Sequence, residues 1–209
     1  MPTIEQARRW YPDDDPTHGF SHILRVHRLC ETLAEAEGAD LKIVRAAALL
    51  HDVEVKASER EQHHLGAADF ARRVLEEEDW PPDHIQAVEH CIRSHRFRDQ
   101  QEQPRTLEAK VLFDADKLDA LGSVGVVRAL AYALQKGESV YDLPSRKFLK
   151  TGQKEPGEAH TPYHEYQYKL RRLAGMLYTR TAKQLARNRS RRMKIFFEGL
   201  REELGATAL

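Results

Sequence analysis

The stretch Ala46-Ala47-Ala48-Leu49-Leu50-His51-Asp52 joins a run of small and apolar residues directly to a histidine and an aspartate. Such a run indicates a buried element, and buried ionisable side chains are costly unless they are paired or bind a metal. The doublet His51-Asp52 would then need partners elsewhere in the chain. Alternatively, it is an ordinary helix C-terminus, with His51 near the negative end of the helix dipole and Asp52 as a cap. On its own the doublet favours this second interpretation, so the first depends on the remaining sequence.

The composition restricts the class of protein. The chain has 209 residues, which suits a single domain over 1–209 with a core that needs no cross-links. Basic and acidic residues are equal at 33 each, so we expect no specific binding of nucleic acid. Cys30 and Cys91 are too few for a disulfide framework or a cysteine zinc site. We predict a soluble, cytoplasmic protein without a membrane partner, because neither a signal peptide nor an apolar run of ~20 residues is present.

Helical periodicity dominates the chain, and alternating strand patterns are almost absent. We therefore predict an all-α fold with a helical core over 16–134 and two additional C-terminal helices within 162–204, the first over about 162–187 and the second over about 190–204. Residues 137–161 contain glycine and proline with little periodicity, and they are predicted as a loop that could act as a lid. The other predicted helices cover 4–10, 17–37, 41–50, 63–78 and 126–135, with further helices around the apolar stripes Ile85 to Ile92 and Leu107 to Ala115.

Three of these helices carry ionisable residues on sides that face the core. His22 lies on the apolar side of its helix, His51 and Asp52 end another, and Asp116 continues the apolar face of a third. Two imidazoles and two carboxylates suit a divalent cation such as Mn, Fe, Co, Ni or Zn. A shared metal ion would explain why all four side chains tolerate burial.

These residues and their surroundings resemble the HD superfamily of metal-dependent phosphohydrolases. The similar segments are HGFSHILRV, AALLHDVE, CIRSHRF and DADKLDALGSVG. The resemblance covers roughly residues 16–134, and the C-terminal helices are similar to those of stand-alone bacterial members. It implies an HD-domain helical bundle and one divalent metal ion (Mn, Mg, Co, Ni, Zn or Fe) held by His22, His51, Asp52 and Asp116. It also implies hydrolysis of a phosphoester or phosphoanhydride by metal-activated water, often on a nucleotide.

Three aspartates compete for the last ligand position in DADKLDALG. The family's ligand immediately precedes a basic residue and a leucine, which selects Asp116 because Lys117-Leu118 follows it. Asp114 is then expected to be a surface or capping residue. Asp119 is expected to accept a hydrogen bond from a ligand histidine.

Further site residues are proposed from their positions. The candidate catalytic residues are Asp52 or His95, as acceptor of the water's proton, and Lys56, as a cation that neutralises phosphate charge. The candidate substrate-binding residues are His18, Arg25, His64 and Lys169. Each of these histidines could instead be a satisfied core residue, and each cation could form a surface ion pair. Glu54 is the only carboxylate soon after the doublet, and its offset departs from the pattern of nucleotide-hydrolysing relatives, so the general acid or base stays open.

Two other functions compete with hydrolysis. A second metal is possible because His64, His90 and His95 occupy the interval in which two-metal relatives add ligands, and a pair of irons would make the protein a di-iron HD-type oxygenase. The third possibility is a non-catalytic nucleotide-binding domain, although such domains usually have a damaged doublet and this one is intact. The expected partner is a small phosphorylated molecule, with a nucleotide as the expected class, and the sequence is compatible with a homodimer.

Overall fold

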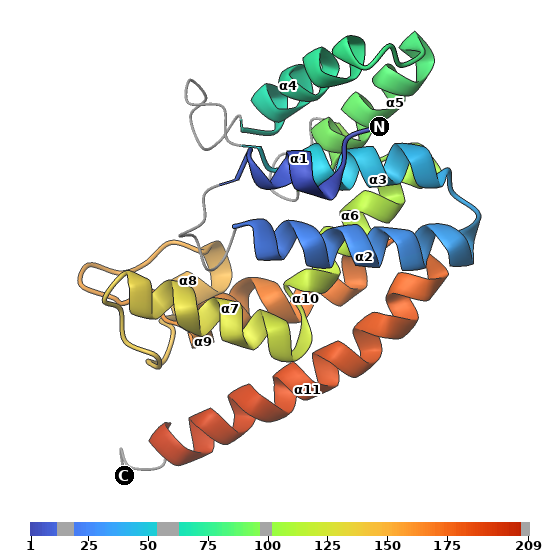
Figure 1. The fold of residues 1–209 in the computed structure, drawn as a ribbon. Coiled ribbons are helices and arrows are strands. Elements are labelled where there is room, and N and C mark those ends of the chain that lie inside the picture. The colour runs from blue at the N-terminus through green and yellow to red at the C-terminus, as the bar shows by residue number, and fades with distance from the viewer. Residues whose placement is uncertain (12–18, 54–62, 97–101, 206–209) are drawn as a thin grey trace. The chain divides into compact units, whose positions relative to one another are not determined.

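The structure, a computed structural model, describes residues 1–11, 19–53, 63–96 and 102–205. Every regular element in these residues is a helix (Figure 1), which confirms the all-α prediction. None of the described helices is both long and apolar enough to cross a membrane. Contacts divide the chain into two compact units, residues 1–116 with 177–182 and residues 117–176 with 183–209. The single domain over 1–209 stays a prediction.

The first unit is a bundle in which α3 is central. In this unit α3 packs on both α2 and α5, and α4 packs on α5 (Figure 1). Helix α3 has the predicted bounds, and α1, α2 and α4 end within a few residues of theirs. The bounds are α1 (Ile4–Arg8), α2 (Phe20–Glu37), α3 (Leu41–Leu50), α4 (His63–Glu77), α5 (Pro82–Ser94) and α6 (Leu107–Asp119), of which the last three residues belong to the second unit.

Local sequence explains where α2 ends and α3 begins. Gly38 ends α2 in the left-handed conformation, with φ of 81°, which glycine adopts without steric cost. Asp40 then caps α3 by accepting hydrogen bonds from the backbone N–H groups of Lys42 (2.7 Å) and Ile43 (3.3 Å). The five residues of the run 46–50 are all buried, so α3 carries the doublet that follows it into the interior of the unit.

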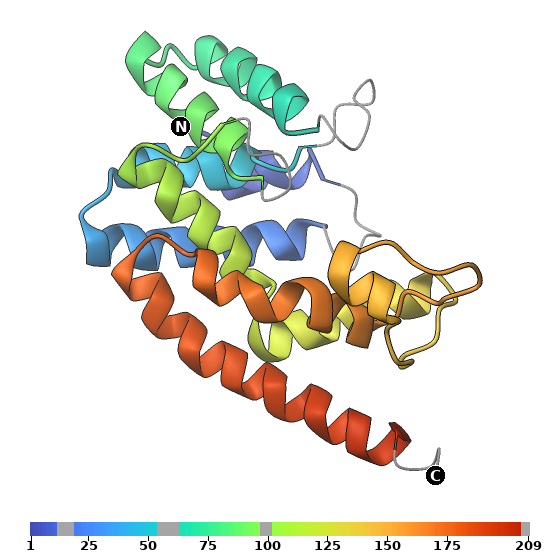
Figure 2. The ribbon, with the colours of Figure 1, turned by 180° about the vertical axis from the view of Figure 1, so that it is seen from behind.

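The second unit contains shorter helices and most of α11, shown from behind in Figure 2, with α9 packed on α7. Two of its elements differ from prediction. Helix α7 starts at Gly122 (φ of 76°), four residues before the expected Val126. Residues 137–161, predicted as a loop, contain the short helix α8, and the Ser145 hydroxyl caps its start. The bounds are α7 (Gly122–Gln135), α8 (Arg146–Thr151), α9 (Pro162–Glu165), the π-helix η1 (Tyr166–Leu170), α10 (Arg171–Leu173), the 3-10 helix η2 (Ala174–Met176) and α11 (Arg180–Gly205).

The predicted break between the last two helices was wrong. It falls at 177–179 rather than at 188–189, and α11 is continuous. The cause is Asp114, which is fully buried and accepts hydrogen bonds from the N–H groups of Tyr178 (2.9 Å) and Thr179 (2.7 Å) and from the Thr179 hydroxyl (2.7 Å). These bonds hold the chain out of helical geometry just before α11. Asp114 is thus a buried acceptor at a helix start: its predicted surface position was wrong, whereas the predicted capping role agrees with these bonds.

Candidate metal centre

The imidazole of His51 is fixed by the C-terminus of α3. The last carbonyl groups of a helix lack intrahelical donors, and His51 Nδ1 lies 2.9 Å from the carbonyl oxygen of Ala48. A carbonyl can only accept, so Nδ1 carries the proton and Nε2 carries the lone pair. His51 Nε2 is buried and has no hydrogen-bond partner among the residues that the structure describes. A buried nitrogen lone pair that accepts no hydrogen bond is the arrangement expected of a metal ligand when the ion itself is left out.

Asp52 lies next to this lone pair, and it leads in turn to His22 and Asp116. Asp52 Oδ2 lies 3.7 Å from His51 Nε2 and 3.6 Å from His22 Nε2. His22 Nε2 also lies 3.5 Å from Asp116 Oδ1. Two atoms that bind the same ion at about 2.1 Å are separated by about 3 to 4 Å, so these distances fit one shared cation. The structure therefore groups His22 of α2 with His51 and Asp52 at the end of α3, and it places Asp116 of α6 next to His22.

Exposure differs between the two kinds of ligand. Both imidazoles are buried, whereas the side chains of Asp52 and Asp116 are 17% and 18% exposed. The cluster therefore opens to solvent on its carboxylate side. A cation held here could keep positions for water or substrate, as catalytic metal sites do.

Burial also sets the charge of His51. Desolvation lowers the pKa of His51 to about 4, while Asp52 opposes this shift and the neighbouring His95 adds to it. His51 is therefore neutral near pH 7. Metal ligation requires the neutral imidazole, so no proton has to be displaced from this residue when a cation binds.

This depressed pKa predicts a pH-dependent stability of the metal-free protein. Its free energy of unfolding should fall as the pH drops from about 6.5 to about 4, since the unfolded chain binds a proton that buried His51 excludes. The contribution is on the order of 3 kcal/mol. Urea unfolding at a series of pH values measures it, and subtracting the His51→Gln profile isolates this residue. Parallel profiles for the two proteins would show that His51 does not titrate in this way.

Tyr11 supports the same helix end from the N-terminal segment. It belongs to a core cluster with Ala7, Phe20, Ile23, Leu49 and Val53. Its hydroxyl donates a hydrogen bond of 2.8 Å to the carbonyl oxygen of Leu49, two residues before His51. Burial raises the pKa of Tyr11 well above its ordinary value, and the charge of Asp52 raises it further. Tyr11 therefore stays a neutral donor to one of the end carbonyls of α3.

Replacing Tyr11 with phenylalanine should lower the free energy of unfolding by about 1 to 2 kcal/mol, because it leaves the buried Leu49 carbonyl without this donor. Urea unfolding of the two proteins measures the difference. Tyr178→Phe is a matched control, since that hydroxyl donates to Gln103 at the surface, and its expected cost is below about 0.5 kcal/mol. Equal losses in both variants would contradict a special role for the Tyr11 hydroxyl.

His95 joins the cluster from the end of α5. It is 3% exposed, and its Nδ1 lies 2.5 Å from the carbonyl oxygen of Ile92. By the same argument as for His51, Nδ1 is the donor and Nε2 carries the lone pair. Nε2 lies 3.5 Å from Asp52 Oδ1, and the rings of His95 and His51 are 5.2 Å apart. Asp52 thus has imidazoles near both of its oxygens.

The other predicted site residues are less closely assembled. His64 is buried near the start of α4, and half-buried Arg25 donates to the Ser21 hydroxyl at 3.3 Å. Lys169 belongs to the second unit, where it pairs with Glu165 at 2.9 Å. Asp119 accepts a hydrogen bond from Arg128 at 2.6 Å, and its bond to a ligand histidine stays a prediction. His18, Glu54 and Lys56 lie outside the described residues.

Comparison with known proteins gives consistent matches. The family model described as HD domain matches residues 19–121. The uncharacterized protein YpgQ of Bacillus subtilis is 31% identical over 208 residues, which cover 96% of this chain and 93% of that protein. A solved structure of a Lactobacillus plantarum protein has a TM-score of 0.78 at 31% identity and covers 99% of this chain and 100% of that one.

Two further structures bear on ligands and activity. YpgQ in complex with ADP has a TM-score of 0.73 at 30% identity, with 97% of this chain and 98% of that chain covered. An HD-superfamily hydrolase from Bacillus thuringiensis has a TM-score of 0.70 at 30% identity, with 97% of this chain and 95% of that chain covered.

Proposed function

The chain belongs to the HD-domain family, and on that premise we propose that it is a metal-dependent phosphohydrolase that cleaves a phosphoester or phosphoanhydride bond of a nucleotide. The observation that carries the proposal is the group of His22, His51 and Asp52, whose ligand atoms all lie within 4.8 Å of one another. Within this group, His51 Nε2 is buried and accepts no hydrogen bond from the residues that the structure describes. A cation would supply the missing partner.

The residues present fit a divalent cation. His22, His51, Asp52 and Asp116 would hold it, as two neutral nitrogens and two carboxylate oxygens. Such an ion supplies Lewis acidity, which acidifies water and polarises a phosphoryl oxygen. The imidazoles are buried, and the two partly exposed carboxylates leave that side of the cluster accessible to a phosphorylated substrate.

Within this proposal, the chain's own residues supply the proton chemistry. His95 Nε2 carries a lone pair and lies at the edge of the cluster, so it can accept the proton that an attacking water loses. Asp52 Oδ1, 3.5 Å away, would stabilise the imidazolium that forms. Asp52 itself remains the alternative proton acceptor. Arg25 and His64 are proposed to contact substrate phosphate oxygens.

The nucleotide substrate is supported by a relative. YpgQ has been crystallised with ADP, and this chain is similar to it along nearly its whole length. A nucleoside diphosphate offers both an ester and an anhydride phosphorus, so the bond that is cleaved has to be determined separately. We propose a nucleotide as the substrate class here without choosing between the two bonds.

A substrate screen tests the proposal. Purified protein is incubated with nucleoside mono-, di- and triphosphates and cyclic dinucleotides, each with Mn, Mg, Co, Ni or Zn, and the products are separated by chromatography. Phosphorus NMR in water enriched in oxygen-18 then identifies the phosphorus that is attacked. We expect hydrolysis of at least one nucleotide class in the presence of one or more of these ions. No phosphate release under any combination would contradict the proposal, and tight nucleotide binding without turnover would support the non-catalytic alternative.

A further inference from the structure

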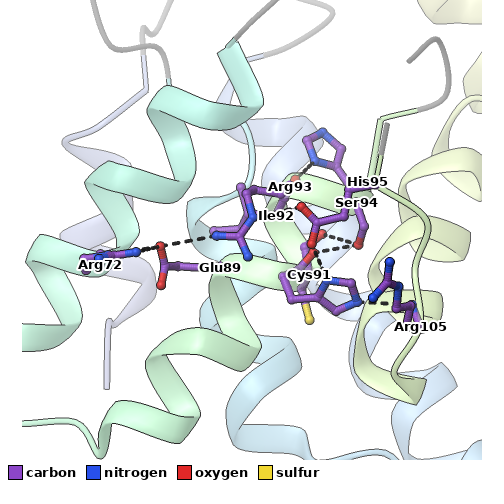
Figure 3. A network of polar contacts seen from close by, with 10 residues as sticks. Arg72, Glu89, Cys91, Ile92, Arg93, Ser94, His95 and Arg105 are labelled. Atoms are coloured by element: carbon purple, nitrogen blue, oxygen red, sulfur yellow. Dashed lines mark hydrogen bonds and ion pairs between the residues drawn. The ribbon is translucent and has the colours of Figure 1, made fainter. Parts of the chain in front are cut away.

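The last turns of α5 carry a network of charged residues that the proposed reaction does not use. Glu89 is buried, with 2% of its surface exposed, and its carboxylate accepts hydrogen bonds from Arg72 of α4 at 2.6 and 3.0 Å. Arg93 donates to the same carboxylate at 3.4 Å. Figure 3 shows Glu89 between the two guanidinium groups. This part of the network ties α5 to α4.

A second carboxylate, that of Glu102, also contacts the last turns of α5. Glu102, which follows α5 in the chain, accepts hydrogen bonds from Arg93 Nε at 2.9 Å and from His90 Nδ1 at 2.6 Å. The backbone N–H of Arg105 donates to His90 Nε2 at 3.1 Å. His90 is therefore the tautomer that carries its proton on Nδ1, and it links Glu102 to the segment that leads into α6. Glu102 and Arg105, which follow α5 in the sequence, thus both contact residues of α5.

This network immediately precedes His95 in the sequence. His95 is the C-cap residue of α5, two positions beyond Arg93, and its Nδ1 lies 2.5 Å from the carbonyl oxygen of Ile92 in the preceding turn. Helix ends fray unless other contacts hold them. The direction of the His95 imidazole therefore depends on whether the preceding turn keeps its geometry. Figure 3 shows the His95 ring at the end of this turn.

We propose that Glu102 is a positioning residue for His95: by bridging His90 and Arg93 it fixes the last turn of α5, and so keeps His95 Nε2 directed at Asp52. The kinetic part of this proposal rests on the proposed function, in which His95 accepts a proton. Burial raises the pKa of Glu102, but hydrogen bonds from His90 and Arg93 outweigh this effect and leave that pKa below its ordinary value. The bridge is therefore ionised at neutral pH, and charge-assisted bonds of this kind are stronger than neutral ones.

The chain contains a matched control for this bridge. Glu31 also lies between a histidine and an arginine, with His27 Nδ1 at 3.6 Å and Arg45 Nε at 2.7 Å, and it is 30% exposed compared with 31% for Glu102. The Glu31 bridge joins α2 to α3 through His27 and Arg45, at a point within both helices rather than at a helix end. Glu31→Gln therefore removes a comparable carboxylate without loosening a helix end that carries a site residue.

Kinetics of a double-mutant cycle separate positioning from general stabilisation. Glu102→Gln should lower kcat about tenfold, with KM changed by less than about twofold, because misplacing a reacting group slows the chemical step. In the His95→Ala background the same substitution should change kcat by less than about twofold, since its effect passes through His95. Glu31→Gln should leave kcat unchanged in both backgrounds, and His90→Gln should behave as Glu102→Gln does. Equal effects of Glu102→Gln with and without His95 would overturn the proposal.

A second measurement does not depend on activity. Long-range proton–nitrogen NMR at pH 8 reports which ring nitrogen of a neutral histidine carries the proton, and the missing signal in His95→Ala assigns the resonance. Wild-type protein and Glu31→Gln should show His95 protonated on Nδ1, whereas Glu102→Gln and His90→Gln should show a mixture of tautomers. An unchanged single tautomer in both variants would overturn the proposal. If the wild type hydrolyses no phosphate ester, the proposed function fails and this spectrum alone decides the positioning role.

Discussion

Asp52→Ala is expected to lower kcat/KM for the cleaved nucleotide by at least about a thousandfold and to abolish metal binding. Asp52 Oδ2 lies within 3.7 Å of the Nε2 atoms of His22 and His51, and Oδ1 lies 3.5 Å from that of His95. The substitution therefore removes one proposed ligand and, at the same time, the carboxylate that faces the proposed proton acceptor. Loss of a residue that merely supports a ligand typically costs ~10- to 100-fold in activity or metal affinity, so loss of a ligand should cost more.

A control variant should lose a carboxylate outside the cluster, so that the effect of Asp52→Ala can be assigned to its position. Asp69 lies on the exposed side of α4, and Asp69→Ala should retain wild-type activity and metal content. Metal content is measured by elemental analysis after equilibrium dialysis, and circular dichroism verifies that each variant is folded. His51→Ala should reproduce the Asp52→Ala result, because it removes the adjacent ligand. Metal binding that survives in both variants would mean that the doublet is not part of the site.

Most of the site could be predicted from the sequence because its signals are local. The apolar run 46–50 predicts a buried element, an aspartate such as Asp40 is typical of a helix start, and a glycine such as Gly38 is typical of a helix end; the structure has each of these features. His22 and Asp116 lie on apolar helix faces, and the fold places His22 3.6 Å from Asp52 and 3.5 Å from Asp116. Periodicity reveals such side chains on apolar helix faces, whereas the choice of Asp116 among three aspartates depends on the resemblance to the family.

The features that were missed depend on contacts between distant residues. Asp114 accepts hydrogen bonds from residues 64 and 65 positions later in the chain. The sequence around Asp114 therefore gives no sign that it determines where α11 begins. Tyr11 contacts Leu49 across 38 residues. Glu102 lies in a polar segment whose composition indicates only a loop, and its pairing with His90 and Arg93 follows from how the chain returns to α5. Their partners become evident only when the helices are packed.

Removing the divalent ion with a chelator is expected to stop hydrolysis, lowering turnover by at least about a thousandfold, and readdition of the ion should restore it. The same treatment should destabilise the protein. An ion present at 100 to 1,000 times its Kd stabilises the folded state by about 3 to 4 kcal/mol, and this is lost on chelation. Thermal unfolding with and without the chelator measures the shift. In Asp52→Ala, which should bind no ion, the chelator should leave the unfolding temperature unchanged.

Elemental analysis of the same samples distinguishes hydrolysis from oxygen chemistry. One ion bound by the four proposed ligands supports a phosphohydrolase, and turnover should then proceed equally well without dioxygen. Two irons per chain, a mixed-valence signal and activity that requires dioxygen would favour the oxygenase, with additional ligands drawn from histidines such as His64 and His95, which are both buried. Full hydrolysis in the chelated protein would contradict both metal-dependent functions. The four-ligand cluster would then be a buried polar network, in which Asp52 pairs with the histidines around it.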